Sequence, residues 1–329
     1  MSLRARLATL AGSLPRARGR SSCARSRSSV PAFSPPGAAV SRTGGGGGHR
    51  GGRAVPRPGA RRALRRRSSS LASSSPSGVV VDTDALLASY LSESQLERVR
   101  AFALALLERN KHMNLTGAAT VDEVLTRHVA DSLALIPAIE RAAGLDPSDP
   151  AASARTPLRV LDVGSGAGFP GMALAIARPR WEVTLLDTLQ KRTAFLDEAA
   201  AACGATNVRT LWSRAEDAGR VGSEHREAYD IVTARAVAEL RVLAELCLPA
   251  VRVGGAWVAA KNSTDGGAGE EAEAARAAVE TLGGGALEAV EVESVGPDGR
   301  LRTAIISKKV KETPEKYPRR AGMPNKRPL

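Results

Sequence analysis

The sequence has few cysteines and no long apolar run, and each absence argues against a class of protein. Its three cysteines, Cys23, Cys203 and Cys247, form no CxxC pair. Such spacing supports neither a disulfide framework nor a metal site, so we expect Cys203 and Cys247, which lie in apolar helical contexts, to be small buried side chains. No stretch of about 18 or more consecutive apolar residues occurs, which argues against a membrane-spanning helix.

Residues 1–78 contain no acidic side chain and no lysine, but sixteen arginines. The formal net charge of +13 therefore comes from this segment, because the rest of the chain holds 31 basic and 34 acidic residues. The segment is rich in Arg, Ser, Gly and Pro, so it has little apolar surface to offset the entropy of folding. Acid-free N-termini rich in Arg and Ser are typical of organelle transit peptides.

We therefore expect residues 1–78 to be a disordered transit peptide, for the chloroplast rather than the mitochondrion. A secretory signal would need a continuous apolar core, which this segment lacks. A retained basic arm that touches RNA is the alternative, with the cluster Arg61–Arg67 as its best support.

Residues 79–150 have the apolar periodicity of helices, with capping boxes at Ser92–Gln95 and Thr120–Glu123. From residue 151 short strands alternate with helices, which predicts an α/β domain over 151–329, doubly wound around a mostly parallel sheet. The expected strands are Leu158–Asp162, Trp181–Leu186, Val208–Trp212, Asp230–Thr233 and Ala256–Ala260, followed by a closing pair at Ala286–Val292 and Arg302–Ser307.

Four further aromatic and imidazole side chains have no motif around them. Trp212 and Trp257 fall inside expected strands, so we expect both in the core. His112 and His225 follow no pattern, and we expect them at the surface.

A glycine-rich loop follows the first expected strand and opens a helix. It runs from Asp162 to Gly171 as DVGSGAGFPG, with glycines at Gly164, Gly166 and Gly168. Glycines let the backbone turn tightly and let a ligand approach it closely. Ligands of parallel α/β sheets bind at the carboxyl ends of the strands. The loop therefore predicts a cofactor site, with these three glycines among its contacts.

Two nucleoside cofactors fit this loop. Residues 166–171 satisfy GxGxxG, and Asp187 follows Gly166 by 21 positions at the end of a strand, where a carboxylate can accept bonds from a ribose diol. Both features occur in NAD sites. Three others favour S-adenosylmethionine: Asp162 can position a cationic amino-acid group, Pro170 removes an N–H that a pyrophosphate would use, and the acidic turn Ser213–Asp217 can accept a bond from adenine. An NAD-dependent oxidoreductase stays open as the alternative.

Six segments, taken together and in this order, resemble the bacterial small-subunit rRNA methyltransferase G family, also called glucose-inhibited division protein B. The resemblance covers roughly residues 80–329. The segments are ERNKHMNLTGAATVDEVLTRHVADSL (Glu108–Leu133), VLDVGSGAGFPG (Val160–Gly171), LLDTLQKRTAFL (Leu185–Leu196), SRAED (Ser213–Asp217), TARAVAEL (Thr233–Leu240) and KYPRRAGMPNKRPL (Lys316–Leu329).

The resemblance implies a seven-stranded class I methyltransferase fold with a helical N-terminal addition. It implies that a monomer uses S-adenosylmethionine to methylate N7 of one guanosine in the decoding-region loop of 16S-type rRNA, as naked RNA or in the small ribosomal subunit. Carried over by position, the cofactor contacts are Gly164, Phe169, Asp187, Thr188, Leu189, Ala215, Glu216 and Arg235. The family often has a glycine directly after the lysine that here is Lys261, whereas this chain has Asn262.

Guanine N7 carries a lone pair and no proton, so methylation there needs alignment of donor and acceptor rather than a general base. We assign no certain catalytic residue and expect Arg235 and Lys261 to position the substrate. The expected RNA contacts, which would bind phosphates by charge, are Arg192, His128, Lys308, Lys309, Arg319 and Arg320. No metal is expected, and a non-catalytic RNA-binding assembly protein is a further alternative.

His128 and Asp131 lie three positions apart on one expected helical face. Either they contact the target base, or they hold the segment Lys111–Thr116 against the catalytic domain. The sequence leaves both interpretations open.

Overall fold

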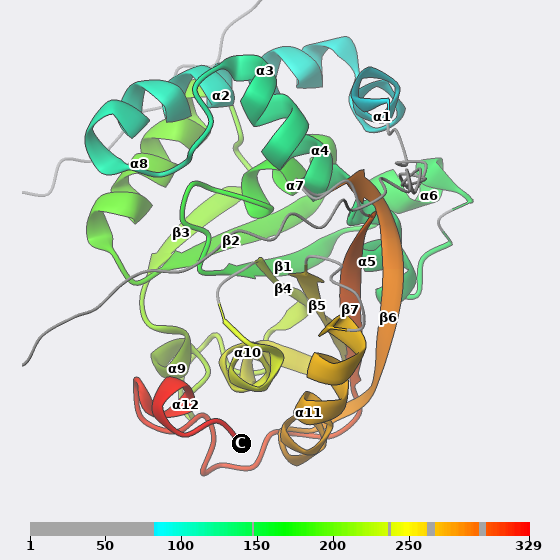
Figure 1. Ribbon diagram of the computed structural model, residues 1–329, viewed down its shortest axis with the longest axis vertical. Helices are drawn as coiled ribbons and strands as arrows, with labels where there is room; N and C mark the ends of the chain where they lie inside the picture. The colour runs from blue at the N-terminus through cyan, green and yellow to red at the C-terminus, as the bar shows by residue number, and fades with distance from the viewer. Residues whose placement is uncertain (1–81, 147, 236–237, 262–266, 296–300) are drawn as a thin grey trace, which may run out of the picture. The chain divides into compact units, whose positions relative to one another are not determined.

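The computed structural model describes residues 82–146, 148–235, 238–261, 267–295 and 301–329 (Figure 1). The expected transit peptide and Cys23 lie outside these residues. Within them, no helix combines the length and the apolar character that crossing a bilayer requires.

Helices occupy most of the N-terminal region, within the range expected to be helical. The expected capping box at the start of α2 is confirmed, because Ser92 and Gln95 each accept the other's backbone N–H. Thr120 caps α3 in the same way, but Glu123 reaches back to the N–H of Ala119 rather than to that of Thr120. The elements are α1 (Thr83–Tyr90), α2 (Glu93–Met113), α3 (Val121–Val124), a π-helical turn (Leu125–Val129), α4 (Ala130–Leu133) and α5 (Ile136–Ala142).

The rest of the chain forms a seven-stranded sheet in the order β3-β2-β1-β4-β5-β7-β6. The first five strands are parallel, and β7 runs antiparallel to both β5 and β6. The predicted fold class is therefore confirmed. The strands are β1 (Leu158–Val163), β2 (Trp181–Asp187), β3 (Val208–Trp212), β4 (Tyr229–Arg235), β5 (Val251–Lys261), β6 (Gly284–Val295) and β7 (Leu301–Lys309).

Helices cover both faces of this sheet (Figure 1). One core lies between the sheet and a layer that includes α2, α7 and α8, and it encloses Phe102 and Trp181; a second core lies under α10 and α11 and encloses Trp257. The remaining helices are α6 (Pro150–Arg155), α7 (Gly171–Ala177), α8 (Gln190–Ala202), α9 (Ala215–Ala218), α10 (Leu240–Cys247), a 3-10 turn (Leu248–Ala250), α11 (Gly267–Thr281) and α12 (Met323–Lys326).

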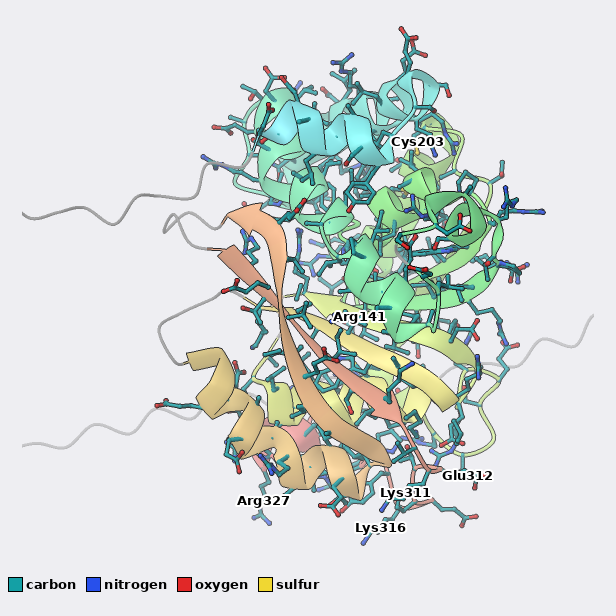
Figure 2. The ribbon with its side chains drawn as sticks, turned by 90° about the vertical axis from the view of Figure 1, so that its right-hand side faces the viewer. Arg141, Cys203, Lys311, Glu312, Lys316 and Arg327 are labelled. Carbon is teal, nitrogen blue, oxygen red and sulfur yellow. The ribbon has the colours of Figure 1, made fainter. Side chains whose placement is uncertain are left out.

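The strand pair β6–β7 crosses the side of the molecule seen in Figure 2. Arg141 of α5 forms an ion pair with Glu288 of β6 at 3.1 Å, so a polar contact joins the pair to the helical region. The sheet and the N-terminal helices therefore support one another.

Burial agrees with the sequence analysis for some side chains and not for others. Cys203 and Cys247 are buried as expected, and Trp257 is fully buried. The expectation for Trp212 is wrong, because its side chain is 58% exposed. It ends β3, an edge strand that has no fully buried residue. His225 is not a free surface residue either, since its Nδ1 hydrogen-bonds to a buried tyrosine hydroxyl at 2.8 Å.

Candidate active site

The glycine loop crosses the carboxyl ends of β1 and β2, as predicted. Gly164, Gly166 and Gly168 have φ values of 74°, 57° and 101°, a left-handed region that favours glycine. A Cβ on Gly166 would meet only the Gly164 carbonyl oxygen, at 3.8 Å, so this side of the loop is open to a ligand. A Cβ on Gly168 would lie 3.0 Å from the side chains of Phe102 and Leu196, so that glycine is needed for packing against α2 and α8.

The loop keeps almost all its N–H groups for bonds within the protein. Between residues 164 and 172, all of which are described, only Ala167 has an N–H group without a hydrogen-bond acceptor, and Pro170 has no N–H. The acceptors are the Leu186 carbonyl for residues 164 and 165, Asp187 for residue 166, the Ser165 carbonyl for residues 168 and 169, Asp162 for residue 171 and the Gly168 carbonyl for residue 172.

This pattern is unsuited to a pyrophosphate, which binds free N–H groups at a helix N-terminus. At the start of α7 that position is held by the carboxylate of Asp162, whose Oδ2 accepts from Gly171 at 3.1 Å. An anionic dinucleotide would meet this acid. The open side of the loop presents the Gly164 carbonyl oxygen, an acceptor that suits a cationic group. The geometry therefore favours S-adenosylmethionine over NAD.

Asp162 itself is fully buried, which corrects the expectation that it touches the ligand. Its second oxygen accepts a bond from the Thr233 hydroxyl at 3.3 Å, so it joins the loop, α7 and β4. Burial raises the pKa of Asp162 to about 6, and its hydrogen bonds oppose that rise. Its role in the described structure is to hold the loop in place.

Asp187 ends β2 directly below the open part of the loop. Its Oδ2 accepts from Gly166 N–H at 3.0 Å, its Oδ1 accepts from Leu189 N–H at 2.9 Å, and Arg192 lies 3.5 Å away. Each carboxylate oxygen can accept a second bond, so hydroxyl groups of a ribose diol can still be bound. Thr188 and Leu189 are exposed beside it. The glycine backbone and this carboxylate fit the nucleoside of S-adenosylmethionine.

Ala215 and Glu216 form the first turn of α9 after β3, and both are buried. The Glu216 Oε1 accepts from the N–H of Gly322 at 2.8 Å. One oxygen of the acid expected to meet adenine is therefore used to hold the C-terminal segment.

An aromatic and cationic cluster closes the other side of the loop. The buried Phe169 ring packs on Phe102 and His128, with centroids 5.2 and 5.1 Å away. The Arg235 guanidinium lies over the same ring, 5.3 Å from its centroid. Burial lowers the pKa of Arg235, and nearby carboxylates, Asp131 first among them, oppose the shift. The structure thus brings together Phe169 and Arg235, which the resemblance assigned to the cofactor, with His128.

Comparisons with known proteins agree with this site. Residues 95–295 match the family model described as "GidB: rRNA small subunit methyltransferase G". The "Ribosomal RNA small subunit methyltransferase G" of Symbiobacterium thermophilum is 44% identical over 251 residues, which cover 74% of this chain and 95% of the relative. The protein of the same name from Pelotomaculum thermopropionicum is 41% identical over 239 residues, covering 73% and 92%.

The chain belongs to the rRNA small subunit methyltransferase G family. The resemblance stated from the sequence is confirmed, and so is the enzyme class, because this is a family of methyltransferases that use S-adenosylmethionine. In the described ranges, no group of three or more His, Cys, Asp and Glu side chains could hold a metal ion.

In this methyltransferase His128 is a neutral residue rather than a phosphate-binding cation. Burial, together with the charge of Arg235, lowers the pKa of His128 to about 4. Its Nε2 is hydrogen-bonded to the Thr116 hydroxyl at 2.7 Å, while its ring packs on Phe169. Of the two interpretations left open by the sequence, the structure supports the one in which His128 holds the segment before α3 against the catalytic domain.

The neighbouring acid, Asp131, binds the far end of the sheet. Its carboxylate forms an ion pair with Arg302 of β7 at 2.9 Å and accepts a bond from the Ser294 hydroxyl of β6. Sequence analysis missed both partners. Arg302 is 171 positions away, and no local pattern marks a contact across such a distance.

The His128 pKa leads to a pH prediction. Its pKa is about 4 in the folded protein and about 6.5 when unfolded, so its stabilisation is present above pH 6.5 and is lost as the pH falls towards 4. The loss has a ceiling of about 3 kcal/mol. We expect His128→Gln, which keeps an acceptor for Thr116, to flatten the fall in urea stability between pH 6.5 and 4.5. Equal slopes in the two proteins would contradict this assignment.

Lys261 lies at the carboxyl end of β5 but its ammonium group is engaged. Its Nζ donates to the Ala238 carbonyl at 3.0 Å and pairs with Glu271 of α11 at 2.7 Å. Glu271 also accepts from the N–H of Leu240 at the start of α10. The residue expected to position the substrate therefore joins three elements at the active edge, and in this structure it acts on the site through them.

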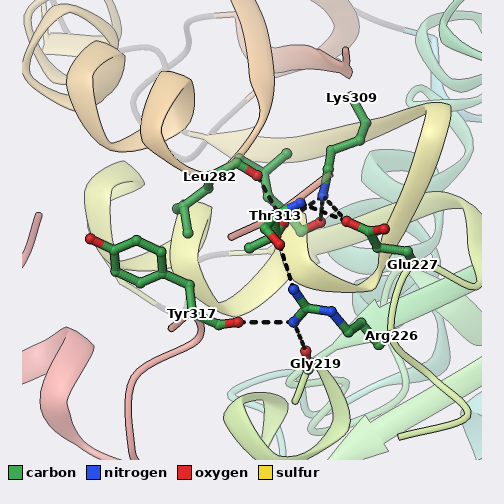
Figure 3. A network of polar contacts seen from close by, with 8 residues as sticks. Gly219, Arg226, Glu227, Leu282, Lys309, Thr313 and Tyr317 are labelled. Atoms are coloured by element: carbon green, nitrogen blue, oxygen red, sulfur yellow. Dashed lines mark hydrogen bonds and ion pairs between the residues drawn. The ribbon is translucent and has the colours of Figure 1, made fainter. Parts of the chain in front are cut away.

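The C-terminal segment is bound to the protein, which corrects most of its expected RNA contacts. Lys309 is 1% exposed; its Nζ donates to the Leu248 carbonyl at 2.7 Å and pairs with Glu227 at 3.2 Å (Figure 3). Burial lowers the pKa of Lys309 to about 8. The Lys308 ammonium donates to the Ala142 carbonyl. Neither lysine is free for RNA in this conformation.

Two arginines fix the remainder of this segment. The Arg226 guanidinium donates to the carbonyls of Gly219, Thr313 and Tyr317 (Figure 3), and Arg319 donates to both oxygens of the buried Glu245. Of the expected tail contacts, Arg320 is exposed and pairs with no described residue. Lys311, Lys316 and Arg327, which no RNA assignment included, point outward in Figure 2.

Adjacent arginines therefore give a matched pair of variants. Arg319→Ala leaves the fully buried Glu245 carboxylate unpaired, and we expect a loss of about 3 kcal/mol in unfolding free energy. Arg320→Ala removes an exposed charge and should change stability by less than about 0.5 kcal/mol. Urea unfolding followed by circular dichroism measures both, and equal effects would show that the tail is not anchored through Arg319.

Proposed function

We propose that this chain uses S-adenosylmethionine to methylate N7 of a guanosine in the decoding-region loop of 16S-type rRNA, inside the chloroplast. One observation carries the cofactor assignment. The loop between residues 164 and 172 keeps one free N–H, yet it leaves the Gly166 side open above the Asp187 carboxylate. That arrangement suits an uncharged nucleoside joined to a cationic amino acid.

When bound, S-adenosylmethionine supplies the methyl group from its sulfonium. The chain's residues bind and align. Asp187 has acceptor capacity for the ribose, and the open glycine backbone allows close approach. Phe169 and Arg235 form the wall beside the loop. The relatives carry the name ribosomal RNA small subunit methyltransferase G, which supports small-subunit rRNA as the substrate here.

The described acids around the loop support N7 as the acceptor. Asp162 is buried and hydrogen-bonded, Asp131 is paired with Arg302, and Asp187 accepts two backbone N–H groups. His128 is bonded to a hydroxyl. None of these groups is free to remove a proton, and guanine N7 carries none. A site that aligns its substrates without a general base fits this atom.

The assay is transfer of tritiated methyl groups from S-adenosylmethionine to small ribosomal subunits, and separately to naked 16S-type rRNA, that lack the modification. We expect 7-methylguanosine after nuclease digestion, at one position in the decoding-region loop. Methylation of another base or atom would contradict the proposed position. Binding of S-adenosylmethionine without transfer to either RNA would instead favour a non-catalytic assembly protein.

The organelle is supported by the Arg- and Ser-rich, acid-free composition of residues 1–78. A fluorescent protein fused behind residues 1–78 should enter chloroplasts in plant cells. The matched fusion behind residues 79–329 should not. Entry into mitochondria would identify the other organelle, and no import would favour the retained basic arm.

A further inference from the structure

Trp212 is placed unlike the other two tryptophans of the chain. Trp181 and Trp257 are fully buried, whereas Trp212 is 58% exposed at the end of β3. The indole is held in place, because its Nε1 donates to the Thr188 carbonyl at 3.1 Å. The next residue, Leu189, is 42% exposed. A fixed, exposed aromatic beside an exposed aliphatic residue forms an apolar surface that can accept a flat ring.

This surface adjoins the candidate active site. Trp212 pairs in register with Asp187 across β2 and β3, and the N–H of Ser213 donates to the Asp187 carbonyl at 3.2 Å. The indole is therefore one strand away from the carboxylate proposed to hold the ribose. A ligand bound on it would lie at the edge where the methyl group is transferred.

Two exposed cations flank this surface. Lys191 lies in the first turn of α8 and Arg214 precedes α9, and neither forms an ion pair with any described residue. The nearby exposed acid, Asp217, is paired with Arg220 at 3.0 Å. Exposed aromatic rings beside unpaired cations are typical of single-stranded nucleic acid binding, where bases stack and phosphates meet the charges.

We propose that Trp212 and Leu189 form a stacking surface for an unpaired base of the RNA substrate, and that Lys191 and Arg214 bind phosphates next to that base. This inference rests on the proposed RNA substrate. The cations decide between the RNA and the adenine of the cofactor as occupant. S-adenosylmethionine carries no phosphate and would leave both cations without a partner, whereas RNA supplies a phosphate at each nucleotide.

Intrinsic fluorescence tests the stacking directly, because Trp212 is the exposed tryptophan and the other two are buried. We titrate the full chain with a single-stranded oligoribonucleotide of the decoding-region loop sequence, and separately with S-adenosylmethionine. The RNA should quench the emission, and Trp212→Phe should remove that quenching. Quenching by S-adenosylmethionine with none by RNA would overturn the proposal in favour of an adenine cover.

Kinetics provide a second measurement. Stacking contributes about 1–3 kcal/mol per base, so Trp212→Ala should raise KM for RNA by about tenfold, with kcat and the Kd for S-adenosylmethionine unchanged. Trp212→Phe should recover most of the loss. The control is Leu104→Ala, which removes an equally exposed apolar side chain from α2. A KM within about twofold of wild type in an active Trp212→Ala enzyme would overturn the stacking role.

The cations are tested by the salt dependence of RNA binding. The double variant Lys191→Ala/Arg214→Ala should lower the slope of log Kd against log salt by about two, one for each lost phosphate contact. An unchanged slope would overturn this part of the proposal. If wild type binds and is quenched by the RNA but methylates none, the proposed function fails while the stacking surface stands.

Discussion

Asp187→Ala is expected to weaken S-adenosylmethionine binding about a hundredfold, equivalent to about 2.7 kcal/mol, while the protein stays folded. The carboxylate is the proposed acceptor for the ribose diol. It also accepts from the N–H groups of Gly166 and Leu189, which would lose their partner and the loop geometry with it. A buried donor left without an acceptor costs about 1–3 kcal/mol.

Isothermal titration calorimetry of the full chain measures this loss, with Asp217→Ala as the control. Asp217 is an exposed acid of the next loop, paired with Arg220, and its removal should change the Kd by less than about twofold. Asp187→Asn should fall between them, since an amide keeps one acceptor oxygen but presents a donor to the second N–H. Unchanged binding in Asp187→Ala would remove this residue from the site.

Gly171→Ala is expected to destabilise the protein by about 3 kcal/mol, a fall in Tm of roughly 6–12 °C. The new Cβ would lie 2.2 Å from a methyl group of Leu185 and 2.9 Å from Oδ2 of Asp162. Leu185 is fully buried and has little room to move. The substitution also disturbs the bond by which Asp162 holds the start of α7, so cofactor binding should weaken with stability.

Gly117→Ala is the matched control for this change. Its Cβ would meet no atom within 4 Å and its backbone is not left-handed, so the Tm should stay within about 1 °C. Differential scanning calorimetry compares the two variants. Equal values of Tm would show that the close approach at Gly171 does not limit the packing of the loop.

The sequence predicts those features that depend on local patterns. Alternating strands and helices predicted the sheet, and a glycine run after an apolar strand predicted the loop, because close backbone approach requires glycine locally. Asp187 was found for the same reason, since the end of a parallel strand lies at the ligand edge. The structure adds the bonds that decide between two cofactors, which involve residues up to 21 positions apart.

Features that depend on distant partners were not predictable in this way. Lys309 and Arg319 belong to a basic tail, and nothing near them signals that Glu227 and Glu245 pair with them. Trp212 has the apolar neighbours of a core residue, but periodicity does not reveal that β3 is an edge strand. Asp162 has the position of a ligand contact, and its burial follows from the packing of α7 and β4.

The central claim is that the glycine loop binds S-adenosylmethionine and not a dinucleotide. The most direct measurement is isothermal titration of the full chain with S-adenosylmethionine and, separately, with NAD. The N–H pattern of the loop predicts saturable binding of S-adenosylmethionine, lost in Asp187→Ala, and no binding of NAD. Binding of NAD without S-adenosylmethionine would contradict the account and make the loop a dinucleotide site.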